Sequence, residues 1–185
     1  QHAASWKSYD KRSYKLAADR CGRKPIAAAD RRSPMLLPTA EFDARLVVMS
    51  LAPEHVYKLQ IREFHLDTFG HVNNAVYLEL FEEARWDIIT ARGYGLDTVM
   101  KTRIGPTILA VNVQFRRELK NRENVVIKTN VVSSEGKISI LRQALFNEKG
   151  EEACTADFTI GLFDLNQRKL VLPTPEWRKA IGLDA

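Results

Sequence analysis

Residues 67–85 read DTFGHVNNAVYLELFEEAR, a short polar loop followed by the first half of a long amphipathic helix. Helical spacing continues from Asn74 to Arg92, with apolar side chains recurring on one face and acidic ones on another. Asn73 is suited to cap the helix, because its side chain can accept a hydrogen bond from a free backbone N–H. Gly93 and Gly95 are suited to end it. The apolar face consists of Tyr77, Phe81, Ala84 and Ile88, and the acidic face of Glu79, Glu83 and Asp87.

The rest of the body shows mainly strand patterns. From Leu109 to Arg116 apolar and polar residues alternate, the period of two expected of a half-buried strand. Turn residues at Glu135-Gly136 and Lys149-Gly150 favour antiparallel neighbours. One long helix that is apolar on one side must then pack on the sheet, which predicts an α+β hotdog fold, a curved antiparallel sheet around one long helix. The predicted strands are 56–66, 109–116, 125–132, 138–146, 153–163 and 170–172, and a short helix is predicted at 176–181.

The first 48 residues differ from the rest of the 185-residue chain. They show no sustained period and no apolar core of a secretory signal. Their Arg, Ala and Ser content would suit an organelle transit peptide, but Asp10, Asp19 and Asp30 count against one. We therefore expect residues 1–48 to be a disordered extension or a leader without function, added artificially or through a misplaced start, and residues 49–185 to be the domain.

The net charge of +5 is unevenly distributed along the chain. Residues 1–48 hold ten Lys or Arg against five Asp or Glu, whereas eighteen of each follow from Met49 onward. A nucleic-acid-binding protein usually concentrates its basic residues on the folded domain, so this distribution argues against that class. No apolar run approaches the roughly 18 residues of a membrane span. Cys21 and Cys154 have no disulfide or metal-ligand spacing, which favours free thiols and a cytoplasmic protein.

The loop before the helix carries groups that suit thioester hydrolysis. That reaction needs a nucleophile or a base that activates water, together with donors that hold the developing oxyanion. Asp67 can supply the carboxylate, and backbone N–H groups of Gly70, His71 and Val72 near the positive end of the helix dipole can polarise the carbonyl. His71, Asn74 and Tyr77 can orient the reactants.

Each of these residues also has a purely structural interpretation. An Asp followed by a Gly before a helix is often only a turn. Asn74 can satisfy backbone groups of the loop, Tyr77 can be a packed core aromatic, and His71 can be a hydrogen-bonded structural histidine. The acidic residues Glu79, Glu82 and Glu83 form a solvated or interface-facing stripe in this interpretation. Individually, these residues leave both interpretations open.

Taken together, the run resembles the 4-hydroxybenzoyl-CoA thioesterase family, specifically its bacterial acyl-CoA thioesterase branch, whose sequences read D-x-x-G-H-V-N-N-x-x-Y-L-x-x-x-E-x-A-R. The resemblance extends through the strand order from about Val56 to Leu172 and leaves out residues 1–48. It implies that Asp67 is the catalytic carboxylate and that the active site lies between two subunits, in a homodimer or homotetramer. The matching positions are Asp67, Gly70, His71, Val72, Asn73, Asn74, Tyr77, Leu78, Glu82, Ala84 and Arg85.

Departures from related families refine the expected substrate. The type member and the Tol–Pal-associated branch carry Tyr or His where Asn74 stands. Plant acyl-carrier-protein thioesterases place an Asn two residues after the Asp, where this chain has Phe69. Their Asp–Asn–His constellation is therefore incomplete here, and the resemblance favours fatty acyl-CoA over a carrier-protein thioester.

A basic group follows the alternating strand and can meet the phosphates of coenzyme A. Arg116 and Arg117 are the candidate substrate-binding residues, with Lys120 and Arg122 beside them and Lys137 as a weaker candidate. The alternative is an ordinary solvated strand end.

The expected activity is hydrolysis of an acyl-CoA to a free acid and coenzyme A, with no metal and no cofactor. Asp67 would act as nucleophile or as general base. Two rival classes remain open, a hotdog hydratase or dehydratase and a non-catalytic module that binds acyl-CoA or acyl carrier protein.

Overall fold

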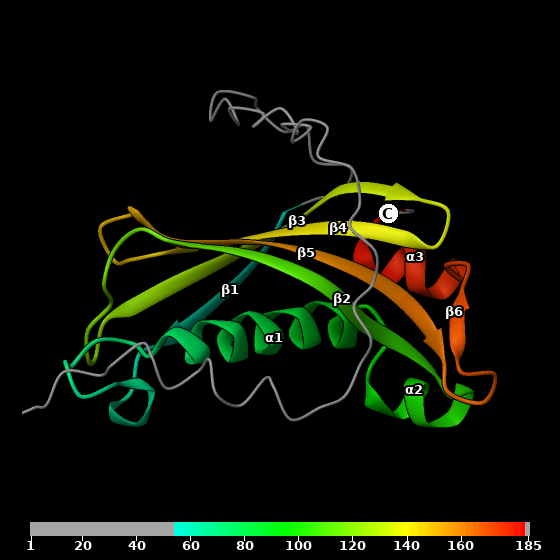
Figure 1. Ribbon diagram of the computed structural model, residues 1–185, viewed down its shortest axis with the longest axis horizontal. Coiled ribbons are helices and arrows are strands. Elements are labelled where there is room, and N and C mark those ends of the chain that lie inside the picture. Colours follow the sequence, from blue (N-terminus) through cyan, green and yellow to red (C-terminus); the bar gives the residue numbers. More distant parts are fainter. Residues whose placement is uncertain (1–53, 184–185) are drawn as a thin grey trace, which may run out of the picture. The chain divides into compact units, whose positions relative to one another are not determined.

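The computed structural model describes residues 54–183, so the predicted leader and Cys21 lie outside the described residues. In this part of the chain a curved antiparallel sheet arches over one long helix, α1 (Asn74–Ala91), as Figure 1 shows. Helices α2 (Leu96–Thr102) and α3 (Pro175–Ile181) lie toward the C-terminal end of α1. This arrangement confirms the predicted α+β hotdog fold.

The sheet has the strand order β1-β3-β4-β5-β2, and β6 pairs with β5 beside this path. Every pair is antiparallel. Among the described residues β1 and β2 therefore lie at the two ends of this path, each with a partner strand on one side. The strands are β1 (His55–Gln60), β2 (Ile104–Phe115), β3 (Asn124–Glu135), β4 (Ile138–Phe146), β5 (Glu152–Asp164) and β6 (Lys169–Val171).

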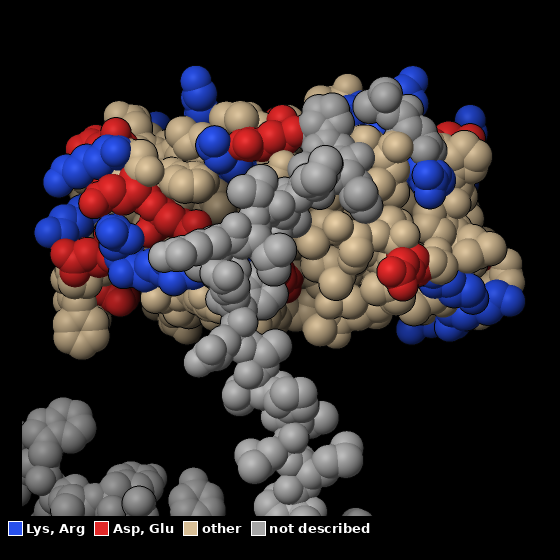
Figure 2. Space-filling model, turned by 90° about the horizontal axis from the view of Figure 1, so that it is seen from above, with Lys and Arg blue, Asp and Glu red and all other residues tan. Residues whose placement is uncertain are grey.

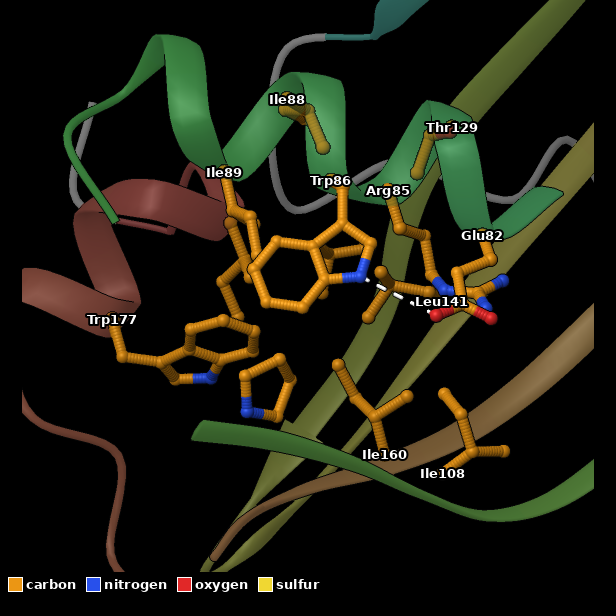
Figure 3. A pocket seen from close by; sticks show the side chains of 13 residues that line it. Glu82, Arg85, Trp86, Ile88, Ile89, Ile108, Thr129, Leu141, Ile160 and Trp177 are labelled. Carbon is orange, nitrogen blue, oxygen red and sulfur yellow. Dashed lines mark hydrogen bonds between the residues drawn. The ribbon is translucent and has the colours of Figure 1, made fainter. Parts of the chain in front are cut away.

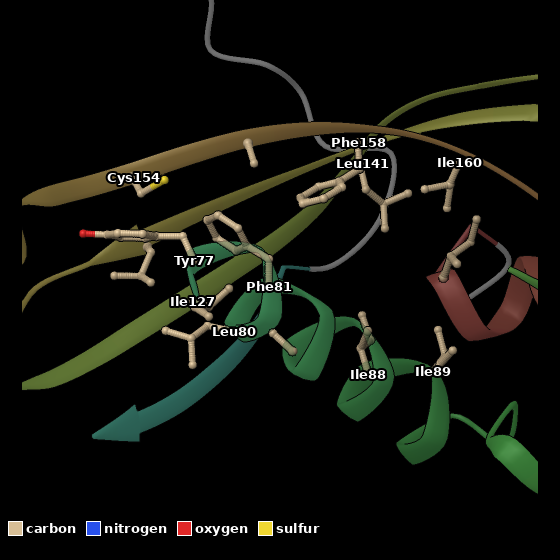
Figure 4. Close-up of a cluster of buried hydrophobic side chains, with 14 of the residues drawn as sticks. Tyr77, Leu80, Phe81, Ile88, Ile89, Ile127, Leu141, Cys154, Phe158 and Ile160 are labelled. Atoms are coloured by element: carbon tan, nitrogen blue, oxygen red, sulfur yellow. The ribbon is translucent and has the colours of Figure 1, made fainter. Parts of the chain in front are cut away.

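The core lies between α1 and the inner face of the sheet (Figure 4). Phe81 is fully buried and meets Phe158 of β5 edge to face, with ring centroids 5.9 Å apart. The predicted apolar face of the helix is confirmed, because all four of its residues are buried. Burying large apolar side chains stabilises a fold by about 1.5–3 kcal/mol each, so this face fixes the helix on the sheet.

A buried polar group also ties α1 to the sheet. The Gln143 amide of β4 donates to the Phe81 carbonyl at 3.1 Å and to Thr129 Oγ1 at 3.0 Å. Its oxygen accepts from Arg85 Nη1 at 2.7 Å, and the Arg85 guanidinium lies 4.0 Å from the centre of the Phe158 ring. Burial lowers the pKa of Arg85 to about 10. Arg85 is thus held between the helix and the sheet by a neutral amide and an aromatic ring, and Glu82 is its charged neighbour.

The predicted helix cap, the stop at Gly93 and the two hairpin turns are confirmed, whereas the predicted part of Gly95 in the helix stop is wrong. The Asn73 side chain accepts from the Ala75 N–H at 2.9 Å and caps α1. Gly93 ends the helix with φ +88°, whereas Gly95 begins α2 as its N-cap, a helix that the sequence pattern did not predict. Gly136 and Gly150 adopt positive φ in the two hairpin turns, which glycine does without the penalty of a Cβ.

The predicted first strand is wrong in its second half. It ends at Gln60, and a 3-10 turn follows at Glu63–His65. The Arg62 N–H donates to His65 Nδ1 at 3.1 Å, and the His65 N–H donates to the Arg62 carbonyl at 3.0 Å. These local bonds replace strand pairing and turn the chain toward the start of α1.

Strand β2 also differs from its prediction. It begins five residues earlier, at Ile104, because an edge strand tolerates the missing N–H of Pro106. The register shifts between Ile108 and Ala110, so Leu109 occupies a bulge. Ile108 therefore lies on the inner face, where the predicted alternation places Leu109. The strand is less covered than expected of a half-buried one, since Ile108, Val111 and Phe115 are all more than two-fifths exposed.

The surface gives two further findings. None of the helices within residues 54–183 has the length and apolar character needed to cross a lipid bilayer. On the face of the sheet that Figure 2 shows, acidic and basic side chains are interspersed where charged residues gather.

Candidate active site

The loop that leads into α1 is closed by its own backbone. The Asp67 N–H donates to the His71 carbonyl at 2.8 Å, and the Gly70 N–H donates to the Asp67 carbonyl at 3.1 Å. Gly70 has φ +78°, a conformation that glycine adopts readily and other residues rarely do. The tight turn therefore holds Asp67 a few residues before the start of the helix.

The two oxygens of the Asp67 carboxylate have different surroundings. Oδ1 accepts from the Phe69 N–H at 2.8 Å and, more weakly, from the His71 N–H at 3.4 Å. Oδ2 has no hydrogen bond with any residue in the described part of the chain. One oxygen thus fixes the carboxylate in place, while the other is available to a substrate or a water molecule.

The Asp67 carboxylate borders a hollow of about 370 Å³, which we call the Asp67 hollow. The loop, the first turn of α1 and the end of β2 meet there. The structure thus brings together all of the predicted site residues except Gly70, which shapes the loop without lining the hollow. The lining residues are Asp67, His71, Val72, Asn74, Tyr77, Phe115, Arg116, Arg117 and Glu118.

Most of the backbone amides expected to polarise a carbonyl already have acceptors. The Gly70 N–H is used inside the turn, and the Val72 N–H donates to the Leu119 carbonyl at 3.0 Å. The His71 N–H makes only the long bond to Asp67, and Asn74, as the first helical residue, has an N–H without a partner inside the helix. The donors that fit an oxyanion best are therefore those of His71 and Asn74.

The His71 ring has a partner that the sequence analysis missed. His71 Nε2 lies 2.9 Å from Glu118 Oε2, and Glu118 Oε1 lies 3.1 Å from Lys120 Nζ. Both side chains are about half exposed on the rim of the hollow. Glu118 is the one acidic residue inside the basic run 116–122, and this was the signal available in the sequence. It orients the His71 imidazole toward the hollow's β2 side.

Tyr77 lines the hollow, and the buried Cys154 lies near Tyr77 without lining the hollow (Figure 4). Desolvation raises the pKa of each to about 12, so neither ionises near neutral pH. The Tyr77 hydroxyl makes a long hydrogen bond of 3.5 Å to the Arg117 carbonyl, and its ring meets Phe115 edge to face at 5.2 Å. Cys154 is therefore a poor nucleophile, and Tyr77 is a packed residue that also borders the site.

The basic group is more strongly paired than the sequence suggested. Arg116 Nε lies 2.5 Å from Glu152, and Arg117 Nε lies 3.7 Å from Glu151. Arg116 and Arg117 line the Asp67 hollow, whereas Arg122 is paired with Glu63 outside it and Lys137 donates to the Leu170 carbonyl elsewhere on the sheet. All of these pairs are partly exposed, so each contributes little to stability and can exchange with a bound anion.

A loop carboxylate at the start of the central helix, under a curved antiparallel sheet, defines a hotdog protein with a thioesterase-like site. The chain belongs to the thioesterase-like superfamily, whose sequence profile matches residues 62–181. This confirms the prediction of a thioesterase. The narrower assignment to the 4-hydroxybenzoyl-CoA thioesterase family stays a prediction.

Individual relatives agree with this assignment. Long-chain acyl-CoA thioesterase FadM of Escherichia coli is 30% identical over 125 residues, which are 67% of this chain and 94% of FadM. The chloroplastic acyl-acyl carrier protein thioesterase ATL3 of Arabidopsis thaliana is 27% identical over 109 residues, 59% of this chain and 57% of ATL3. The crystal structure of YbaW, a probable thioesterase from Escherichia coli, superposes with a TM-score of 0.61 at 29% identity, covering 68% of this chain and 95% of YbaW.

Proposed function

We propose that this protein hydrolyses acyl-CoA thioesters, with fatty acyl-CoA as the preferred class, to the free acid and coenzyme A. The observation that carries the proposal is the Asp67 carboxylate, anchored through one oxygen and available through the other at the N-terminal end of α1. Similarity to a long-chain acyl-CoA thioesterase over most of the domain supports the substrate class.

Two chemical routes fit this arrangement. In the first, Asp67 Oδ2 attacks the thioester carbon, the C–S bond breaks, the coenzyme A thiolate takes a proton, and water hydrolyses the resulting anhydride. In the second, Asp67 removes a proton from water as the water attacks, and the thiolate leaves with that proton. In both, the His71 and Asn74 N–H groups and the positive end of α1 stabilise the developing oxyanion.

Coenzyme A would enter from the β2 end of the hollow. Arg116 and Arg117 lie there, and Arg–phosphate contacts are among the stronger charge-assisted hydrogen bonds. Phosphate oxygens would replace Glu152 and Glu151 as their partners. No Asn stands two residues after Asp67, since Phe69 occupies that position and is 82% exposed, which favours coenzyme A over carrier protein as the thiol carrier.

A thiol-release assay with Asp67→Asn tests the proposal. We expect the variant to lose more than ~10²-fold in rate while remaining folded, the scale of a lost general base. Asp97→Asn, an exposed carboxylate in the first turn of α2, is the matched control and should keep its rate. Wild-type protein that binds a non-hydrolysable acyl-CoA analogue but releases no thiol, or that hydrates an enoyl-CoA instead, would overturn the proposal.

The route can be examined separately by a single turnover in isotopically heavy water. Label that enters the Asp67 carboxylate supports the anhydride route. Mass spectrometry of the peptide that contains Asp67 provides the measurement.

We also propose that two copies of the chain assemble along β2, as a homodimer or within a homotetramer. An edge strand leaves a row of backbone groups to which another copy can pair, and β2 stands at the end of the strand order with a partner on one side among the described residues. Such pairing would bring a second subunit to the Asp67 hollow, whose rim includes Phe115. Sedimentation of the full chain should give a dimer or tetramer mass, and a monomer would contradict this arrangement.

A further inference from the structure

A second, apolar pocket lies at the other end of α1, and we call it the far pocket. It has a volume of about 120 Å³, close to the roughly 150 Å³ of an apolar cavity that holds benzene. Figure 3 shows the indoles of Trp86 from α1 and Trp177 from α3 pointing into it. The remaining walls are mainly aliphatic, among them Ile89, Ile108, Leu141 and Ile160, while Glu82, Arg85 and Thr129 contribute polar atoms on one side (Figure 3).

An apolar track on β2 joins the two sites. Residues directly opposite each other on paired strands share a face of the sheet, and the inner face of β5 carries buried apolar side chains. Opposite them lie the inward-facing residues of β2. Phe115 begins this track in the Asp67 hollow, and Ile108 ends it in the far pocket. In order, the residues are Phe115, Val113, Val111, Ile108 and Pro106.

The separation of the two sites fits an extended acyl chain. The far pocket is lined by α1 residues five to twelve positions beyond Tyr77, which corresponds to roughly 8–18 Å along the helix. An extended backbone spans about 1.2 Å per bond, since three bonds cover at most about 3.6 Å. A chain that starts at the Asp67 hollow therefore reaches the pocket after about 7 bonds and its end after about 15.

The pocket ends on a rigid side chain. Trp177 is buried and meets Tyr94 edge to face at 5.3 Å. Its own backbone N–H donates to the N-cap Thr174, and Arg92 of the α1 C-cap donates to the Ala180 carbonyl at 3.3 Å. The indole thus cannot move aside without disturbing the packing of α3 on α1.

We propose that the acyl chain of the substrate runs along the inner face of β2 into the far pocket and that Trp177 sets the longest chain that fits. This inference rests on the proposed thioester substrate. It identifies the substrate class as straight acyl chains of medium to long length.

Ile108→Trp tests the path, with Leu109→Trp as its matched control. Ile108 and Leu109 are neighbours with similar exposure, but Ile108 lines the far pocket whereas Leu109 occupies the bulge, with its side chain beside Gly161. We expect Ile108→Trp to lower kcat/KM for hexadecanoyl-CoA about tenfold or more and to leave butanoyl-CoA within about twofold, since filling an apolar pocket excludes only chains that reach it. Leu109→Trp should leave both substrates unchanged.

Trp177→Leu tests the limit itself. The smaller side chain should move the preferred length toward octadecanoyl-CoA and longer chains, with thermal unfolding as the check that α3 still packs. If this variant does not fold, Trp177→Phe, which keeps an aromatic ring opposite Tyr94, takes its place in the test of the limit, and Ile108→Trp decides the path. Equal length profiles for Ile108→Trp and Leu109→Trp would overturn the path, and an unchanged profile for a folded Trp177→Leu would overturn the limit.

Binding of hexadecyl-CoA, a thioether that cannot be hydrolysed, separates this inference from the proposed function. Binding that Ile108→Trp weakens and Leu109→Trp does not, in a protein that hydrolyses no thioester, would sustain the pocket and overturn the hydrolase. Hydrolysis at all chain lengths with no difference between the two variants would sustain the proposed hydrolase and overturn the acyl-chain path. Calorimetric titration of each variant provides the measurement.

Discussion

Two aspartates of this molecule sit in similar turns and differ in what surrounds them. Asp67 Oδ1 accepts from the N–H two residues on, at 2.8 Å, and Asp164 Oδ1 does the same with Asn166 at 2.8 Å. At Asp164 the Gln167 N–H also donates to Oδ1, and the Gln167 side chain donates to Oδ2 at 2.8 Å. At Asp67 both hydrogen bonds with described residues use Oδ1, and the residue borders a hollow beside a helix start.

This comparison shows that a local motif does not make a site. Both turns use the same side-chain-to-backbone bond, which Asp forms readily. Asp164 has both oxygens occupied and is 6% exposed, so it can only stabilise its turn. Asp67 keeps one oxygen and an open neighbourhood, so it can act on a ligand.

The largest expected difference in activity comes from replacing Asp67 and Asp164, one at a time, by Asn. Asp67→Asn should lower the rate of thiol release more than ~10²-fold, which corresponds to about 2.7 kcal/mol. Asp164→Asn should leave the rate within about twofold and lower the free energy of unfolding, because charge-assisted hydrogen bonds are lost. Thiol release and urea unfolding of both variants measure the two effects. A similar rate loss at Asp164 would break the comparison.

Two glycines in similar turns extend the comparison, one beside the Asp67 hollow and one away from it. Gly70 in the Asp67 loop and Gly150 in the β4–β5 turn have φ of +78° and +77°, and an added Cβ would meet nothing within 4 Å at either position. Alanine should therefore cost about 1–2 kcal/mol of stability at each site through backbone strain alone. Only Gly70→Ala should also lower activity, since it displaces Asp67. Parallel unfolding curves and rates check this, and equal activity in the two variants would contradict it.

The helix cap beside the Asp67 hollow should matter less. Asn73→Ala removes the acceptor for the Ala75 N–H and should cost about 1 kcal/mol. Thr174→Ala removes the corresponding cap of α3, whose side chain accepts from the Trp177 N–H at 3.2 Å. We expect similar stability losses by urea unfolding, with the rate for butanoyl-CoA lowered only by Asn73→Ala. A lowered butanoyl-CoA rate in Thr174→Ala would speak against separate roles of the two helix starts.

The smallest effect is the acid dependence of stability. Backbone hydrogen bonds, first from Gln167, hold the pKa of Asp164 below its ordinary value of 3.8. A carboxyl whose pKa is lower in the folded state stabilises the fold fully above about 3.8 and loses that contribution as pH falls through its folded pKa. The free energy of unfolding of Asp164→Asn should therefore fall less steeply below about pH 4 than that of the wild type. Identical acid profiles would remove Asp164 as a contributor.

Local sequence patterns predicted a large part of this architecture. The long helix, its cap, its buried face and the two glycine turns follow from periods and turn residues that act within a few positions. The first strand was predicted too long, because local bonds of Arg62 and His65 compete with strand pairing in a way that composition does not reveal.

For the candidate site, the sequence indicated the residues but not which side chains contact one another. The run from Asp67 to Tyr77 indicated the chemistry, and the structure brings these residues to one hollow. Glu118 lies beside His71, and Glu152 and Glu151 pair with Arg116 and Arg117, although the partners in these pairs are 34–47 positions apart in the sequence.

The amino-acid sequence by itself determined the long helix α1, its apolar face and the approximate positions of the strands, since backbone geometry and side-chain periodicity are local properties. It did not determine α2, the end of β1 or the start of β2. Only the tertiary structure decided that β2 pairs with β5, that its bulge turns Ile108 rather than Leu109 inward, and that Trp177 closes the pocket at the far end of α1. These features depend on strand register and on the packing of distant segments, because shifting a strand by one residue exchanges its two faces without changing any local preference.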